Sequence, residues 1–176
     1  MNDYEVGAEF YEVQYMRHPA LLAFVAIIAA FMWISFVRQV VYGIPFGAHP
    51  AQDWVLWVFV LLFGVGLPVL IYTARLETVV REGALMFRYV PFHMSWRVVP
   101  CTSIVRADAQ RYSPLREFGG WGIRFGRRGR AYSASGSRGV RIECRDGDRF
   151  LLGSARAVEL ARCIAACREK SDGDRS

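Results

Sequence analysis

Two long apolar stretches decide the fold: LLAFVAIIAAFMWISFV at residues 21–37 and WVLWVFVLLFGVGLPVLIYTA at residues 54–74. Neither stretch contains a charged residue, and the first is followed directly by Arg38. A bilayer core of about 30 Å needs roughly 20 apolar residues in helical form, and only a helix or a closed barrel satisfies its backbone groups there. We therefore expect residues 19–74 to form a transmembrane helical hairpin, with the lipid bilayer as its partner.

The charges beside the two stretches predict the orientation of the hairpin. The connector GIPFGAHPAQD at residues 43–53 has no Lys or Arg, whereas Arg17 precedes the first stretch and Arg75 follows the second. The positive-inside rule then places both termini in the cytoplasm. Arg38 is the one contrary charge, which we expect to snorkel to the membrane surface; a buried charge against the partner helix is the alternative.

Residues 1–18 are predicted to form a cytoplasmic N-terminal arm, and its conformation stays open. The arm carries four acidic residues and, before Arg17, no basic one. Phe10, Val13 and Met16 fall at helical spacing, which is typical of a short interfacial helix. A frayed terminus is the equal alternative.

After residue 75 the pattern changes to an alternation of apolar and polar residues, which predicts antiparallel strands. Glu82-Gly83 and Asp146-Gly147 are the expected tight turns, and the second pair is a specific hairpin signal. The segment SARAVELARCIAACREK at residues 154–170 has one apolar face and Ser154 near its start, which predicts a closing amphipathic helix. Residues 171–176 are expected to be a disordered tail.

The fold class is therefore α+β: a two-helix transmembrane hairpin, then an antiparallel barrel of about seven strands capped by a C-terminal α-helix at residues 75–170. This is the strand and helix count of a pleckstrin-homology-like (PH-like) barrel.

Three segments make the chain resemble a family of small, uncharacterised bacterial membrane proteins with a two-helix hairpin and a PH-like domain. The segments are YEVQ at residues 11–14, RYSPLREFGGWGIRFGRRGRAYSASGSRGV at 111–140 and DGDRFLLGSARAVELARCI at 146–164. The resemblance implies a bacterial inner membrane and a cytoplasmic PH-like domain. It brings no established activity.

Residues 111–141 form an arginine-rich segment, with eight arginines and the single acid Glu117. Arginine forks bind phosphate and carboxylate, and neighbouring glycines allow backbone N–H groups to approach an anion. The candidate residues for binding an anion or a partner are Arg116, Arg124, Arg127, Arg128, Arg130 and Arg138. The alternative is that these arginines are solvated on exposed strand faces. Trp121 is expected in the core, and its glycine neighbours are expected to set a turn or bulge.

No catalytic, metal or cofactor site is predicted. The three histidines, His18, His49 and His93, are scattered, and no nucleophile and base motif appears. Cys163 and Cys167 would stand one turn apart on a helix, but no CxxC or neighbouring His completes a zinc set, so we expect the cysteines to act as small apolar residues. Nucleic acid is not an expected partner.

The sequence favours a non-enzymatic, membrane-anchored interaction module that presents a basic PH-like domain to the cytoplasm. Its partner would be anionic lipid headgroups or another membrane protein. Two alternatives stay open. One is a structural membrane-assembly protein that acts through its hairpin; the other is an enzyme with an unrecognised site.

Overall fold

The computed structural model describes residues 7–45, 52–126 and 129–173, and the chain divides into two compact units. One unit is the continuous segment Arg17–Thr73. The other unit combines the residues before this segment with those from Ala74 onward. The hairpin is thus an insertion into a sheet-containing domain, rather than a segment that precedes it.

The inserted unit is a helical hairpin with two runs long and apolar enough to cross a membrane, Pro19–Val41 and Asp53–Thr73. The first run comprises α1 (Pro19–Phe36) and the π-helical turn η1 (Val37–Val41), and the second comprises α2 (Asp53–Phe59), the π-helical η2 (Val60–Gly66) and α3 (Leu67–Thr73). Large apolar side chains such as Phe24, Ile27 and Leu61 are more than half exposed. A helix that is apolar on all sides is typical of a membrane span.

Gly64 allows the two runs to pack closely. A Cβ at this position would lie 3.1 Å from Nε1 of Trp33, which donates a hydrogen bond to the Gly64 carbonyl oxygen.

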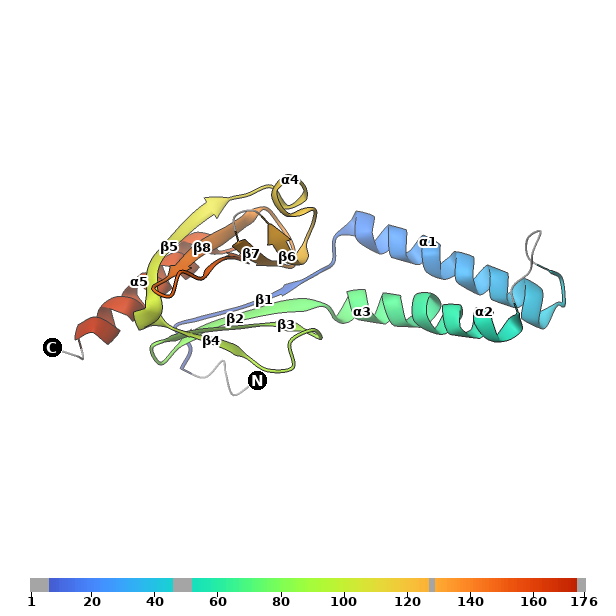
Figure 1. Cartoon of the computed structure of the whole chain (residues 1–176), viewed down its shortest axis with the longest axis horizontal. Coiled ribbons are helices and arrows are strands. Elements are labelled where there is room, and N and C mark those ends of the chain that lie inside the picture. The colour runs from blue at the N-terminus through green and yellow to red at the C-terminus, as the bar shows by residue number, and fades with distance from the viewer. Residues whose placement is uncertain (1–6, 46–51, 127–128, 174–176) are drawn as a thin grey trace. The chain divides into compact units, whose positions relative to one another are not determined.

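The second unit contains two β-sheets and three short or closing helices (Figure 1). The four-stranded sheet has the order β1-β2-β3-β4, with β1 (Phe10–Tyr15), β2 (Arg75–Arg81), β3 (Ala84–Val90) and β4 (Arg97–Pro100). The five-stranded sheet has the order β5-β8-β9-β7-β6, with β5 (Ile104–Arg111), β6 (Gly122–Gly126), β7 (Gly129–Ser133), β8 (Arg138–Cys144) and β9 (Arg149–Gly153). The helices are the 3₁₀ turn η3 (Cys101–Ser103), α4 (Pro114–Phe118) and α5 (Ala157–Gly173).

Strand β1 corrects the prediction for the N-terminal arm. Over Phe10–Tyr15 the chain forms neither an interfacial helix nor a frayed end, because these residues pair antiparallel with β2 from Phe10 opposite Val80 to Tyr15 opposite Arg75. The sequence of this strand lacks a clear alternation of apolar and polar residues, because the polar residue Glu12 has a structural role inside the domain. Its carboxylate accepts hydrogen bonds from Ser154 Oγ (2.5 Å) and from the Ala155 backbone N–H (2.9 Å).

Both predicted tight turns are confirmed. Glu82 and Gly83, with φ of 50° and 74°, join β2 to β3. Asp146 and Gly147 join β8 to β9, and Gly147 has φ of 85°. Positive φ at the centre of such turns suits the twist of the strands they connect.

The expected antiparallel barrel is wrong in two respects. The strands form two separate sheets rather than one closed barrel, and β7 pairs with β9 in parallel, with Ala131 opposite Leu151. A parallel pair needs a long crossover, here through β8, and no local sequence signal reveals it.

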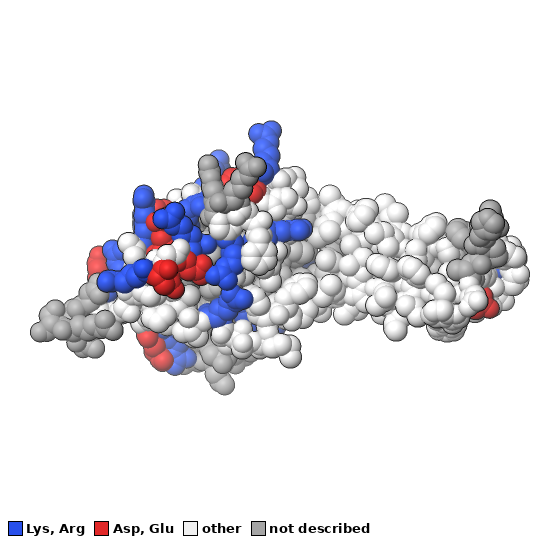
Figure 2. Space-filling model, viewed as in Figure 1, with Lys and Arg blue, Asp and Glu red and all other residues white. Residues whose placement is uncertain are grey.

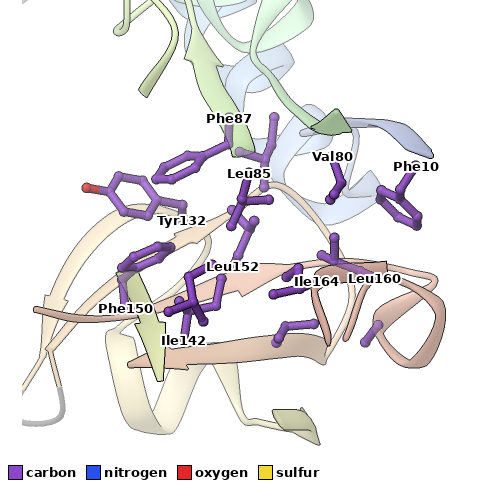
Figure 3. Packing of buried hydrophobic residues seen from close by; sticks show 14 of the residues in the cluster. Phe10, Val80, Leu85, Phe87, Tyr132, Ile142, Phe150, Leu152, Leu160 and Ile164 are labelled. Atoms are coloured by element: carbon purple, nitrogen blue, oxygen red, sulfur yellow. The ribbon is translucent and has the colours of Figure 1, made fainter. Parts of the chain in front are cut away.

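The core lies between the two sheets and is closed by α5. Side chains from both sheets and from this helix point toward one another, including Phe87, Ile142, Leu160 and Ile164 (Figure 3). The predicted closing helix is confirmed, but it begins at Ala157 and continues to Gly173, into the segment expected to be a disordered tail.

Candidate functional site

The arginine-rich segment is spread over several elements. Arg116 lies on α4, Arg124 on β6, Arg130 on β7 and Arg138 at the start of β8. Arg127 and Arg128 lie outside the described residues. Figure 2 shows basic side chains over the sheet unit with acidic side chains among them, whereas the hairpin presents few charges.

The motif SPLREFGG, at residues 113–120, builds a short capped helix. Pro114 occupies the first turn of α4, and the Glu117 carboxylate accepts a hydrogen bond from the Ser113 backbone N–H at 2.8 Å. Gly119, with φ of 70°, ends the helix, and its N–H donates to the Leu115 carbonyl oxygen. This is the usual pairing of proline at the start of a helix with glycine at its end. The prediction that the glycines set a turn is confirmed.

A second hydrophobic cluster anchors α4 to the five-stranded sheet. It consists of Tyr112, Phe118, Ala131 and Leu151, all buried. The rings of Tyr112 and Phe118 meet edge to face at 6.1 Å. The distinctive part of the motif therefore has a structural role, and it leaves Arg116 exposed on α4.

Trp121 is half-buried rather than in the core, which corrects the prediction for this residue. Its indole Nε1 donates a hydrogen bond to the Gly136 carbonyl oxygen at 2.9 Å, and its own carbonyl accepts one from Arg124 Nε at 3.2 Å. Trp121 thus joins the start of β6 to the loop between β7 and β8.

Among the described candidate arginines, Arg130 lines a groove on the sheet unit. This open groove has a volume of about 590 Å³ and lies across β7, β8 and β9. Its charged lining residues are Arg130, Arg141, Glu143, Asp148 and Arg149. We call these five residues the basic groove; Arg116, Arg124 and Arg138 do not line it.

Ion pairs organise the basic groove. Arg130 Nη2 lies 2.5 Å from Asp148 Oδ2, and Arg149 Nε lies 3.6 Å from Glu143 Oε1. The hydrogen bond from Arg130 lowers the pKa of Asp148, and the same bond raises the pKa of Arg130. Arg141 donates to the Gln110 amide oxygen, with the amide oriented toward it, at 3.0 and 3.2 Å. The guanidinium groups are thus held in place, and because three arginines face two carboxylates, the basic groove carries a net charge of +1.

Gly129 leaves room for the backbone at one end of the basic groove. A Cβ there would collide with the Arg149 carbonyl oxygen, and the residue has φ of 104°. Glycine is required at this position for close approach of the strands.

A second polar cluster lies beside the core and was not predicted. Arg97 Nη1 donates to the hydroxyl of the buried Tyr132 at 2.9 Å, and the His93 ring lies 5.7 Å from the Tyr132 ring. Burial and the charge of Arg97 lower the pKa of His93. No local pattern indicates this cluster, because His93 and Arg97 lie far from Tyr132 along the chain.

The cysteines require a further correction. Cys101 and Cys167 form a disulfide with a Cα–Cα distance of 6.0 Å, which joins η3 to α5 across 66 residues. They are therefore more than small apolar residues. Cys163 and Cys144 are free thiols, and burial raises the pKa of both. Within the described ranges, no group of three His, Cys, Asp or Glu side chains is placed to hold a metal ion.

The fold and the groove together define a class of protein: a two-sheet α+β domain, with a basic groove, into which a hairpin of two apolar helices is inserted between β1 and β2. The chain belongs to the family of unknown function DUF6141, which matches residues 1–167. No curated protein and no solved structure matches the chain.

Proposed function

We propose that this protein is an integral membrane protein whose sheet domain is a non-enzymatic interaction module for an anionic partner. The basic groove carries this proposal, because Arg130, Arg141 and Arg149 line one surface and are fixed by hydrogen bonds or ion pairs. Guanidinium groups held in this way lose little freedom when they bind a phosphate or a carboxylate.

The membrane location rests on the hairpin. Two runs of 23 and 21 residues are long enough to span a bilayer. In the most apolar part of each run, only 17% and 6% of the residues are buried within the protein. Buried core helices of soluble proteins differ in that they hide their apolar side chains. A bilayer would cover what this hairpin exposes.

We place both termini in the cytoplasm, on the bacterial inner membrane, because Arg17, Arg75 and Arg81 flank the hairpin on that side. The disulfide argues for the opposite side, since cytosolic thiols are kept reduced. In the cytoplasm, Cys101 and Cys167 would be two buried thiols in contact. Labelling of intact cells with a membrane-impermeant thiol reagent distinguishes the two orientations, with an engineered Ser137→Cys at an exposed loop position and the free thiols removed by Cys144→Ser/Cys163→Ser.

We assign the domain to a PH-like architecture only at the level of β-sheets closed by a C-terminal helix. The helix α5 supports this assignment because it packs Leu160 and Ile164 between the sheets. The open sheets and the parallel β7–β9 pair distinguish the domain from a closed barrel.

The proposal is tested by in-cell crosslinking of the full-length protein followed by mass spectrometry. The variant Arg141→Ser/Arg149→Ser should lose a specific partner, while the matched variant Arg106→Ser/Arg162→Ser, with two arginines outside the basic groove, should retain it. Equal capture by both variants would show that the groove does not bind the partner.

A second candidate function is a structural role in membrane assembly, and a groove on the hairpin favours it. This apolar groove is lined by small residues, Ala26, Ala29 and Gly64, together with Leu22 and Pro68. Small residues allow transmembrane helices to approach closely. Ala26→Leu/Ala29→Leu should then abolish assembly, whereas the arginine variants should not.

A further inference from the structure

The loop between β3 and β4, residues 91–96 with the sequence PFHMSW, exposes two large apolar side chains. Phe92 is 57% exposed and Met94 is 94% exposed. Loops on a soluble surface are usually polar, so this composition needs an explanation.

One polar side chain of the loop, His93, is turned inward. The Tyr89 backbone N–H donates to His93 Nδ1 at 3.2 Å, and the His93 N–H donates to the Tyr89 carbonyl oxygen at 2.7 Å. The base of the loop is also fixed, because the Arg88 guanidinium lies 4.4 Å from the centre of the Trp96 ring. The loop is thus a compact turn that holds its apolar side chains outward.

The strand register places this loop at the end of the sheet where the chain leaves for the hairpin. Val90, the last residue of β3, is opposite Arg75, the first residue of β2. Met16 and Ala74, the last residues of the sheet unit on either side of the hairpin, are joined by a backbone hydrogen bond of 3.0 Å. Opposed residues on paired strands lie about 5 Å apart, so the loop begins beside the junction.

Chain connectivity fixes how far this junction lies from the membrane. Ala74 follows Thr73, the last residue of the second run, and two residues separate Met16 from Pro19, the first residue of the first run. A chain extends by at most about 3.6 Å per residue, so the junction lies within about 10 Å of the helix ends. Because Val90 is opposite Arg75, the residue after Ala74, the loop begins within the same short reach of the helix ends.

We propose that residues 91–96 form an interfacial anchor that inserts Phe92 and Met94 into the headgroup region of the bilayer that the hairpin spans. This inference rests on the proposed membrane location of the hairpin. Tyr15, 42% exposed at the same end of the sheet, adds an aromatic side chain suited to the interface. The anchor would add a second attachment of the chain to the bilayer beside the hairpin.

The test is photocrosslinking of the full-length protein in vesicles of phosphatidylethanolamine and phosphatidylglycerol that contain a labelled lipid tracer. The photoreactive amino acid p-benzoylphenylalanine replaces Phe92 or Met94 in two separate variants. The matched control places it at Val105, which is also exposed, at 53%, but follows Cys101, whose N–H donates to the Gly83 carbonyl at the opposite end of the sheet. A further variant places it at Phe24 on α1.

We expect lipid adducts at positions 92 and 94 to exceed those at position 105 at least several-fold, with strong adducts at position 24. Adducts at position 24 with equal yields at 92, 94 and 105 would overturn the anchor and leave the membrane hairpin in place. An absence of lipid adducts at position 24 would overturn the membrane location and the anchor together. Circular dichroism of each variant verifies that it is folded.

Discussion

Among the described residues, Glu77 is the charged residue that is most deeply buried. It is 3% exposed, and its two oxygens each lie 2.6 Å from an arginine Nε, one from Arg75 and one from Arg88. Removing one member of a buried ion network leaves uncompensated charge, which costs about 3–5 kcal/mol. Because both arginines are partly exposed, we expect Glu77→Gln to lower the free energy of unfolding by about 3 kcal/mol, the lower end of that range.

The measurement is urea unfolding of the full chain in detergent, followed by tryptophan fluorescence. Glu143→Gln is the matched control, since its pair with Arg149 is longer and more exposed, and we expect a loss below about 1 kcal/mol. Equal losses in the two variants would contradict a special role for Glu77.

His93 should make the stability of the domain depend on pH. Its folded-state pKa is lowered by burial and by Arg97, so between this pKa and the unfolded value of about 6.5 the unfolded chain binds more protons. Stability is therefore retained above about pH 6.5 and falls as the pH drops through this window. Protonation also removes the acceptor for the Tyr89 N–H.

Thermal unfolding between pH 7.5 and 5 measures this effect, and His93→Asn should flatten the dependence. The same slope in this variant would assign the effect to another group. Loosening of the 91–96 loop at low pH should appear as faster amide hydrogen exchange at Tyr89.

The disulfide ties the C-terminal helix to the turn between the two sheets. A cross-link that closes a loop of this length stabilises the folded chain by about 4 kcal/mol in the chain-entropy model. We expect reduction with dithiothreitol to lower the urea midpoint of protein purified with this disulfide formed. Cys144→Ser/Cys163→Ser, which leaves the cross-link intact, should show the same response to reduction.

The urea midpoint of Cys101→Ser/Cys167→Ser should not change on reduction. It should equal the midpoint of the reduced native protein or lie below it. A midpoint of the native protein that does not change on reduction would contradict a stabilising disulfide.

The sequence predicts the elements whose signals are local. The hairpin follows from two uncharged runs, the tight turns follow from Glu82-Gly83 and Asp146-Gly147, and α5 follows from its apolar face. Elements that depend on distant partners escaped prediction. Strand β1 looked polar in the sequence, because the hydrogen-bond partners of Glu12 lie more than 140 residues further along the chain. The Cys101–Cys167 disulfide escaped prediction for the same reason, since its two cysteines are far apart in the sequence.

The candidate site was predicted only in outline. Local charge singled out Arg130, which lines the basic groove, but its partner Asp148 lies in the β8–β9 turn and its groove neighbours Arg141 and Arg149 lie on β8 and β9. Arg116 and Arg138 have the same local charge and lie outside the basic groove. Sequence spacing cannot separate these cases, because sheet order decides which arginines share a surface.

The sheet domain depends on both of its chain segments, the residues before the hairpin and those from Ala74 onward. Phe10 is 3% exposed in the core, Glu12 caps the start of the closing segment, and Lys170 Nζ lies 2.5 Å from Glu9 Oε1. Deletion of residues 1–16 should therefore unfold the sheet domain, as seen by loss of protease resistance in membranes. Phe10→Ala alone should cost about 3–5 kcal/mol, whereas Tyr15→Ala, at an exposed position, should cost much less.

The hydrogen bond between Met16 and Ala74 also bears on how the protein is made. During synthesis, the first strand emerges long before its partner, and the two become neighbours only if the intervening chain crosses the membrane an even number of times. A chain with a single crossing would leave β1 and β2 on opposite sides of the bilayer, with a sheet that cannot form and apolar strand residues open to proteases. Under the proposed membrane topology, formation of the β1–β2 pair therefore requires that both apolar runs cross the bilayer.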